Sequence, residues 1–236
     1  VALSVFNLGT IAVTPTRTAE NTESLGSAVS IFTEKELDAR GIYTVKEALR
    51  KDFSADVVQS GSSGGLTSLF LRGANSNHTR VMIDGVRVFD PTSPSGAYDL
   101  AHLTTDNVRQ IEIIKGPQSS LYGSDAIGGV VNVITNKGVG KPNAKVFSEG
   151  GSCYTFREGT ELAGQLDRFH FSLSASRLDS DGISSAQAKL NNPEKDAYDN
   201  QTYSTRIDYD LTDSLEVGYI GRYTYANYEY DDEFGV

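Results

Sequence analysis

Residues 81–135 read VMIDGVRVFDPTSPSGAYDLAHLTTDNVRQIEIIKGPQSSLYGSDAIGGVVNVIT, and the rest of the chain is organised around this stretch. Three runs in it are rich in the β-branched residues that favour strands, and they lie at 81–88, 111–114 and 130–134. The pair Asp84-Gly85 interrupts the first run and is a strong signal for a two-residue hairpin turn. The stretch therefore predicts a small sheet that displays the loop between Phe89 and Tyr98.

Length and composition bound the class of protein. The chain has 236 residues, enough for one large or two ordinary domains. Its hydrophobic content of 38% and its mean hydropathy of −0.32 are low for this length. No apolar run approaches the roughly 18 residues of a membrane helix, which excludes a helical membrane protein, whereas a β-barrel needs only alternating strands. Val1–Leu8 lacks the basic region and the cleavage site of a signal peptide, so its origin as a signal-peptide remnant stays open.

The net charge of −10 is unevenly distributed. Residues 1–138 carry 14 acidic and 12 basic residues, whereas residues 139–236 carry 17 acidic and 9 basic residues. A surface that binds phosphates needs the opposite sign, so no nucleic-acid partner is expected. The asymmetry predicts a domain boundary near 138–142.

The segment before residue 81 predicts short helices and strands. Thr33 and Glu36 form a capping-box pattern that predicts a helix over about 34–40, and Gly41 is placed to end it. Thr44 and Glu47 repeat the pattern and predict a second helix to about residue 51. Runs at 57–58 and 67–72 are expected to be strands, so the first part of the chain is a compact α+β unit.

After residue 142 the pattern changes to alternation of apolar and polar residues. The alternating segments lie at 169–175, 203–211 and 215–225, and two weaker strands are expected at about 143–151 and 154–165. Short turns at one end and a long polar loop over 179–201 at the other end are typical of a transmembrane barrel. Tyrosines near the strand ends favour this interpretation, because aromatic residues gather at membrane interfaces. A soluble antiparallel sheet with one solvated face would show the same periodicity.

Several motifs occur in one order that resembles a known family. LFLRGANS, VMIDGVRV, NVRQIEIIKGP and SSLYGSDAIGGVVNVIT resemble the plug domain of TonB-dependent outer-membrane receptors, over residues 10–137. The run TIAVTPTR at 10–17 resembles the TonB box that precedes such a plug. Within the family, SGSSGGLTSLFLRGANSNHTRVMIDGVRV is most similar to the plug of the cobalamin (vitamin B12) transporters.

The resemblance implies a division of the chain and a function. The expected parts are an N-terminal segment at 1–17, an α+β plug domain at 18–138, and the first antiparallel transmembrane β-barrel strands at 139–236. About five strands fit there, so we interpret the chain as a fragment of a longer product, with a barrel completed by another chain as the alternative. The implied function is TonB-dependent active uptake of a scarce nutrient, cobalamin, across the bacterial outer membrane, without enzymatic chemistry. A siderophore or haem receptor, and a plug-like binding module that does not transport, are the alternatives.

The same resemblance implies partners and site residues. The energy-coupling protein TonB is expected to pair by β-augmentation with Thr10, Ile11, Ala12, Val13 and Thr14, although the run also fits an ordinary edge strand. Outer-membrane lipid and a small-molecule ligand are the other partners. Two outward loops, Ser60–Thr67 and Phe89–Tyr98, are expected to contact the ligand rather than solvent alone. Their candidate ligand-binding residues are Ser62, Ser63, Leu66, Thr67, Phe89, Pro91, Thr92, Ser93, Ser95 and Tyr98.

Acidic residues gather in the second part of the chain. No cofactor is expected to be required, but carboxylates on loops suit calcium, and the resemblance implies calcium in extracellular loops. Solvated surface loops are the alternative. The candidate calcium ligands are Asp179, Asp181, Asp196, Asp199 and Asp231.

Overall fold

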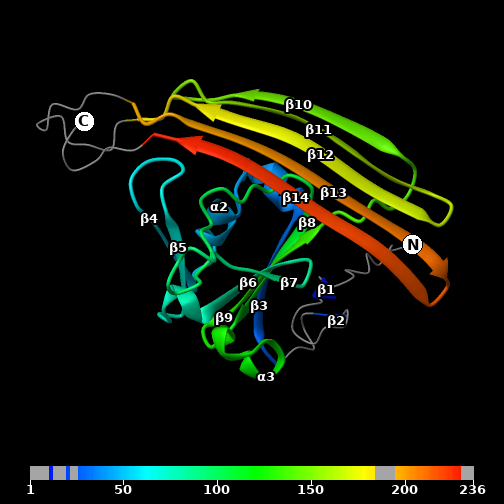
Figure 1. Cartoon of the computed structure of the whole chain (residues 1–236), viewed down its shortest axis with the longest axis horizontal. Coiled ribbons are helices and arrows are strands. Elements are labelled where there is room, and N and C mark those ends of the chain that lie inside the picture. Colours follow the sequence, from blue (N-terminus) through cyan, green and yellow to red (C-terminus); the bar gives the residue numbers. More distant parts are fainter. Residues whose placement is uncertain (1–10, 13–19, 22–25, 184–194, 230–236) are drawn as a thin grey trace, which may run out of the picture.

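The computed structural model describes residues 11–12, 20–21, 26–183 and 195–229, and it contains two separate five-stranded sheets (Figure 1). The first sheet belongs to the N-terminal domain, residues 26–138. Its strands, in spatial order, are β3 (Ala28–Thr33), β8 (Val108–Lys115), β9 (Gly129–Thr135), β6 (Thr79–Ile83) and β7 (Val86–Val88). Strands β6 and β9 run parallel, and the other neighbours are antiparallel.

The predicted hairpin turn is confirmed. Asp84 and Gly85 separate β6 from β7, and their φ angles of 48° and 80° are both positive. Such angles are required at both central residues of the tight turn that matches the twist of a hairpin. The turn places β7 at the edge of the sheet, and the chain continues from it into the loop that begins at Phe89.

Short helices pack beside this sheet. Helix α1 (Glu34–Arg40) begins at the predicted capping box, in which Glu36 accepts a 3.0 Å hydrogen bond from the amide of Thr33, and it ends at Gly41 with φ of 60°. Helix α2 (Val45–Leu49) ends two residues before the predicted position. The remaining elements of this half are β1 (Ile11–Ala12), β2 (Glu20–Asn21), β4 (Ala55–Gln59), β5 (Thr67–Leu71), η2 (Ser76–His78), α3 (Ser119–Tyr122) and η3 (Ser124–Ala126).

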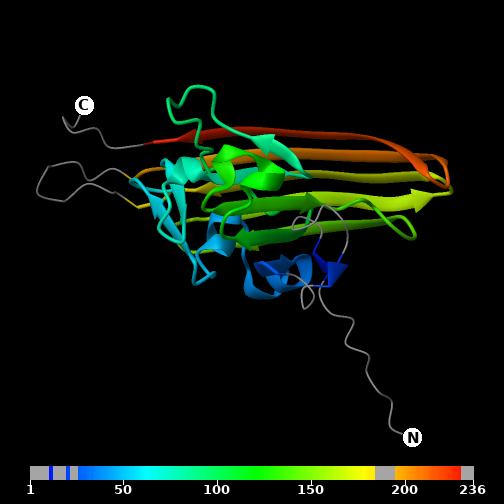
Figure 2. The same ribbon diagram turned by 90° about the horizontal axis from the view of Figure 1, so that it is seen from below.

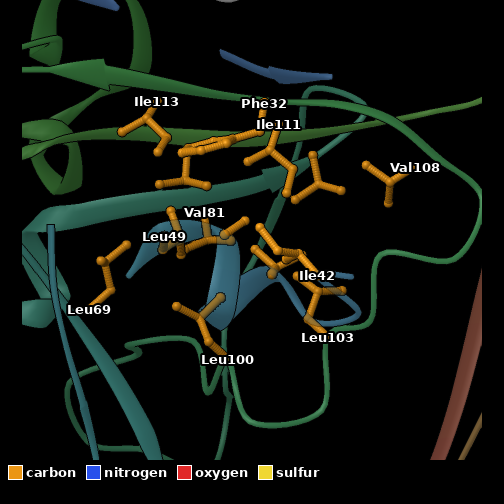
Figure 3. Close-up of a cluster of buried hydrophobic side chains, with 14 of the residues drawn as sticks. Phe32, Ile42, Leu49, Leu69, Val81, Leu100, Leu103, Val108, Ile111 and Ile113 are labelled. Carbon is orange, nitrogen blue, oxygen red and sulfur yellow. The ribbon is translucent and has the colours of Figure 1, made fainter. Parts of the chain in front are cut away.

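The core of the N-terminal domain lies between its sheet and α1 and α2. Figure 3 shows Ile111 and Ile113 of β8 and Val81 of β6 facing Leu49 of α2. Leu100 and Leu103 reach the same cluster from the segment after the Phe89–Tyr98 loop. Burial of this apolar surface fixes where that loop starts and ends, because both of its flanks are held in the core.

The second sheet, which we call the long sheet, consists of consecutive antiparallel strands. They are β10 (Asn143–Gly150), β11 (Phe156–Leu166), β12 (Phe169–Ser180), β13 (Tyr198–Thr212) and β14 (Leu215–Tyr228). Figures 1 and 2 show that this sheet runs lengthwise past the N-terminal domain and covers one side of it. None of the described helices is long and apolar enough to cross a membrane.

The two faces of the long sheet differ in the expected way. On β13 the residues that face the N-terminal domain are polar and buried, among them Thr202, Ser204 and Asp208. Their neighbours on the opposite face, including Tyr203 and Tyr209, are apolar and exposed. The apolar face therefore points outward and the polar face points toward the protein, which is the reverse of a soluble sheet packed on a core.

The predicted bounds of the long polar loop are wrong. Strand β12 continues to Ser180 and β13 begins at Tyr198, so Asp179 and Asp199 lie opposite each other within the sheet. Arg177 binds both carboxylates, at 2.9 Å to Asp179 and 2.7 Å to Asp199. Burial also holds the start of β13, because Tyr198 and Asn200 are 4% and 1% exposed and Nδ2 of Asn200 donates to the carbonyl of His102 at 3.3 Å.

Truncation of the core should open the sheet of the N-terminal domain. Ile111 is fully buried in β8, so Ile111→Ala is expected to lower the free energy of opening by about 2–5 kcal/mol through lost burial and a residual cavity. Hydrogen exchange of β8 and β9 peptides in the purified full-length protein measures this. Val58→Ala, at a half-exposed position on β4, is the control and should stay within about 0.5 kcal/mol. Equal effects of the two substitutions would contradict the assigned core.

Candidate functional site

The two loops expected to contact a ligand lie side by side because Asp99 joins them. Its Oδ1 accepts hydrogen bonds from the amide of Thr67, at 2.9 Å, and from the amide of Ala101, at 2.9 Å. The amide of Leu100 also donates to the carbonyl of Thr67 at 3.1 Å. The end of the Ser60–Thr67 loop is thus bound directly to the end of the Phe89–Tyr98 loop.

A groove of about 430 Å³ opens between the Phe89–Tyr98 loop with its flank and β14. The N-terminal domain supplies one side, on which an aromatic surface alternates with carboxylates, and β14 supplies the other with small side chains. Its lining consists of Phe89, Asp90, Pro91, Tyr98, Asp99, His102, Thr224 and Ala226. This combination suits a bulky ligand that carries both apolar faces and hydrogen-bonding groups.

The Ser60–Thr67 loop also contacts the ends of β13 and β14. A Cβ atom on Gly64 would lie 2.6 Å from Tyr228 Cβ and 2.8 Å from a ring carbon of Tyr198, and Gly64 has φ of 92°. Only glycine fits this position, because both the space and the backbone angle exclude a side chain. The Ser62 hydroxyl adds a 3.4 Å hydrogen bond to the carbonyl of Glu229.

His102 lies at the base of the groove between two tyrosines. Its ring stacks on Tyr198 with centroids 5.9 Å apart and meets Tyr228 at 5.7 Å. Its Nδ1 is 3.2 Å from the Tyr198 hydroxyl. Burial lowers the pKa of His102 below the ordinary value of 6.5, and Lys46 acts in the same direction, whereas Asp99 opposes the shift. The imidazole is therefore neutral at pH 7.

The structure gives the predicted ligand-binding residues different roles. Leu66 and Phe89 expose 57% and 51% of their surface, which leaves them free for contact. Thr67 is fully buried and its hydroxyl donates to the carbonyl of Gly65 at 2.9 Å, so its side chain holds the loop together. The other predicted residues, of which Tyr98 and Pro91 line the groove, are exposed or half-buried: Ser62, Ser63, Pro91, Thr92, Ser93, Ser95 and Tyr98.

Hydrogen bonds order the Phe89–Tyr98 loop from within. Asp90 accepts from both the amide and the hydroxyl of Thr92, at 2.8 and 2.7 Å, and these bonds lower the pKa of Asp90. The hydroxyls of Ser93 and Ser95 lie 3.0 Å apart. These bonds restrict the backbone of the loop without the help of a ligand.

Of the five residues predicted to bind calcium, the four that the structure describes are paired with cations or buried. Asp179 and Asp199 bind Arg177, and Asp181 binds Lys195 at 3.2 Å. Asp196 is buried, and Asp231 lies outside the described residues. Within the described part of the chain, no three such side chains are grouped closely enough to hold a metal ion. Calcium binding stays a prediction.

Part of the predicted TonB-box run is visible. Ile11 and Ala12 form β1, which pairs antiparallel with Glu20 and Asn21 of β2, and Ala12 is fully buried. Thr10, Val13 and Thr14 lie outside the described residues. The role of the run as a partner-binding strand remains a prediction.

Sequence reasoning missed Asp99, His102 and the segment Thr104–Asn107. Asp99 directly follows the predicted loop, yet its role in joining the two loops depends on the amide of Thr67, 32 residues away. Thr104–Asn107 contacts the long sheet through residues more than 50 positions later. The sequence TTDN carries a turn signal, but it does not name the partners of its side chains.

Comparisons with known proteins agree with this architecture. Residues 21–130 match the family model described as TonB-dependent Receptor Plug Domain. The Vitamin B12 transporter BtuB of Photobacterium profundum is 31% identical over 226 residues, which cover 96% of this chain and 37% of that protein.

Two solved structures illustrate the shared fold. The ferripyoverdine receptor of Pseudomonas aeruginosa matches with a TM-score of 0.76 and 16% identity, over 91% of this chain and 27% of that one. The siderophore receptor PirA of Acinetobacter baumannii matches with a TM-score of 0.69 and 21% identity, over 89% of this chain and 32% of that one. At these identities the likeness establishes the fold alone. The chain spans 37% or less of the length of these relatives.

Loss of the Asp99 carboxylate should loosen both loops. Asp99→Ala leaves the amides of Thr67 and Ala101 without their acceptor, which is expected to cost about 1–3 kcal/mol of local opening free energy. Hydrogen exchange of peptides covering 60–67 and 97–102 measures the change. Asp90→Ala removes an equivalent carboxylate whose bonds stay within one loop, so exchange at 60–67 should not change. Unchanged exchange in Asp99→Ala would refute the connection.

Acid should weaken the base of the groove. Because the pKa of His102 is lowered by folding, the unfolded state binds the proton more readily, and stability falls as the pH drops below 6.5 toward the folded pKa. The opening free energy of peptides around 97–107, followed by hydrogen exchange corrected for pH, should decrease over that range. His102→Gln should flatten the dependence, and an unaltered pH profile in this variant would exclude His102 as its source.

Proposed function

Because the chain belongs to the TonB-dependent receptors of the bacterial outer membrane, we propose that it is part of an active transporter that takes up cobalamin. The ligand binds from outside in the groove between the Phe89–Tyr98 loop and β14, beside the Ser60–Thr67 loop, and no covalent chemistry is performed on it. The apolar outer face of the long sheet contacts membrane lipid.

The observation that carries this proposal is the joining of the two loops beside β14. Asp99 fixes Ser60–Thr67 against the end of Phe89–Tyr98, and exposed Leu66 and Phe89 project from the joined loops. A large ligand with apolar edges and many amide groups is matched by aromatic side chains together with ordered hydroxyls. The 31% identity to a vitamin B12 transporter supports cobalamin over a siderophore as the ligand.

Energy for release is proposed to come from TonB through the N-terminal run Thr10–Thr14. The described part of this run makes only a two-residue pairing between β1 and β2. An antiparallel ladder this short adds little stability, so a partner strand that offers a longer ladder can replace it. Calcium is proposed as an auxiliary ion at the acidic end of the long sheet, where Asp179, Asp181 and Asp199 lie.

Cobalamin binding and uptake test this function. The full-length protein in outer membranes should bind cyanocobalamin, more tightly with calcium than with a chelator, and cells should accumulate it only when TonB is present. A ferric siderophore bound in place of cyanocobalamin would make the protein a siderophore receptor. Binding without TonB-dependent accumulation would indicate a binding module that does not transport.

A matched pair of variants tests whether the ligand binds in the groove. Phe89→Ala removes an exposed ring from the groove and is expected to raise the Kd for cyanocobalamin about tenfold, equivalent to about 1.4 kcal/mol of lost apolar contact. Phe53→Ala removes a fully exposed ring between α2 and β4, outside the groove, and should leave the Kd unchanged. Equilibrium titration of outer membranes with radiolabelled ligand measures both. Equal Kd values would place the ligand elsewhere.

A further inference from the structure

Two carboxylates of the N-terminal domain line the groove, and each commits one of its oxygens to the local backbone. Oδ1 of Asp90 accepts from the amide and the hydroxyl of Thr92, at 2.8 and 2.7 Å. Oδ1 of Asp99 accepts from the amides of Thr67 and Ala101, both at 2.9 Å. The first oxygen of each carboxylate therefore shapes a loop.

The second oxygen of each carboxylate is left for another partner. Among the residues that the structure describes, none donates a hydrogen bond to Oδ2 of Asp90 or of Asp99. A carboxylate accepts hydrogen bonds at both of its oxygens and has no proton to donate. Each Oδ2 can therefore accept from an N–H group of a molecule in the groove.

The N-terminal side of the groove carries negative charge. None of the described residues that line the groove is a lysine or an arginine. His102 is neutral at pH 7, because burial lowers its pKa. Hydrogen bonds from Thr92 lower the pKa of Asp90, so this carboxylate is ionised at the same pH.

The cations nearest to these carboxylates are engaged or buried. Arg87 lies over the ring of Phe89, with its guanidinium carbon 5.3 Å from the ring centroid, but it pairs with Asp125 at 2.6 Å. Lys46 attracts Asp99 from α2, where it is 8% exposed. Asp90 has no cationic partner in the described part of the chain, so its charge is compensated least.

This arrangement distinguishes a ligand amide from a ligand carboxylate. A primary amide can donate to an Oδ2 atom of the groove. A carboxylate in the same position has no proton to donate, so it would lose that hydrogen bond and would also be repelled by the like charge. The groove thus combines an attraction for one group with a repulsion of the other, which is how specific sites reject close analogues.

We propose that Asp90 and Asp99 make the receptor select ligands that present primary amides over otherwise identical ligands that present carboxylates. The inference rests on the proposed binding of cobalamin, whose ring carries several primary amides. It extends that function by separating the fully amidated ligand from its partly hydrolysed, acidic forms.

The monocarboxylic acids of cyanocobalamin test this selection, because each replaces one amide of the ligand by a carboxylate. Competition with radiolabelled cyanocobalamin, in outer membranes that contain the full-length receptor, gives the Kd of each acid. At least one acid is expected to have a Kd about tenfold higher than that of cyanocobalamin. Added salt should lower this Kd ratio, because screening weakens the repulsion between like charges.

Two conservative variants locate the selection. Asp90→Asn and Asp99→Asn keep an acceptor oxygen for the backbone bonds but remove the charge, so each should lower the Kd ratio about threefold. Asp56→Asn removes the same charge from an exposed position on β4 outside the groove, and it should leave the ratio unchanged. A purely structural role of Asp90 or Asp99 would shift both Kd values together and leave their ratio unchanged.

Equal Kd values for cyanocobalamin and all of its monocarboxylic acids would overturn the selection, and so would a Kd ratio that neither variant lowers. If neither variant binds cyanocobalamin, the salt dependence of the wild-type ratio decides, and a ratio that salt does not lower overturns the selection. Failure of the wild-type receptor to bind cyanocobalamin would instead overturn the proposed function, and this inference with it.

Discussion

The polar inner face of the long sheet is the constraint on which the rest of the structure depends. Side chains such as Ser204 and Arg222 point away from the apolar outer face and need hydrogen-bonding partners. The segment Thr104–Asn107 supplies them from the N-terminal domain, with Asp106 and Asn107 each contacting more than one strand. The two halves of the chain therefore depend on each other, because each satisfies polar groups that the other buries.

This attachment also positions the ligand groove. Leu100 and Leu103 lie in the core and anchor the stretch of chain that joins the Phe89–Tyr98 loop to Thr104–Asn107. The loop is therefore held at a fixed place beside β14. Asp99, at the start of the same short connection, brings the Ser60–Thr67 loop to it. Residues that line the groove, pack in the core and bind the long sheet thus follow one another within residues 98–107.

Local signals predicted local structure well, and contacts between distant residues could not be predicted. The Asp84-Gly85 turn and the capping box of Thr33 were correct because their physics involves adjacent residues. The loop over 179–201 was drawn too long because Tyr198 and Asn200, at the start of β13, are buried through contacts with His102, almost a hundred residues earlier. Thr67 was expected to face a ligand, but its burial depends on packing that its serine- and glycine-rich neighbours do not reveal. The resemblance identified the family, whereas the contacts of Thr104–Asn107 and of Asp99 with distant residues are visible only in the three-dimensional structure.

The orientation of the long sheet is most directly tested by spin labels at adjacent positions 203 and 204 of the full-length protein in outer membranes. Tyr203 is exposed on the apolar face, and Ser204 is buried against Asn107. A label at 203 should collide readily with oxygen dissolved in lipid, and a label at 204 should be immobilised and shielded from both oxygen and a water-soluble relaxation agent. Equal exposure of both labels to the water-soluble agent would contradict a membrane-facing sheet with the N-terminal domain docked on its inner face.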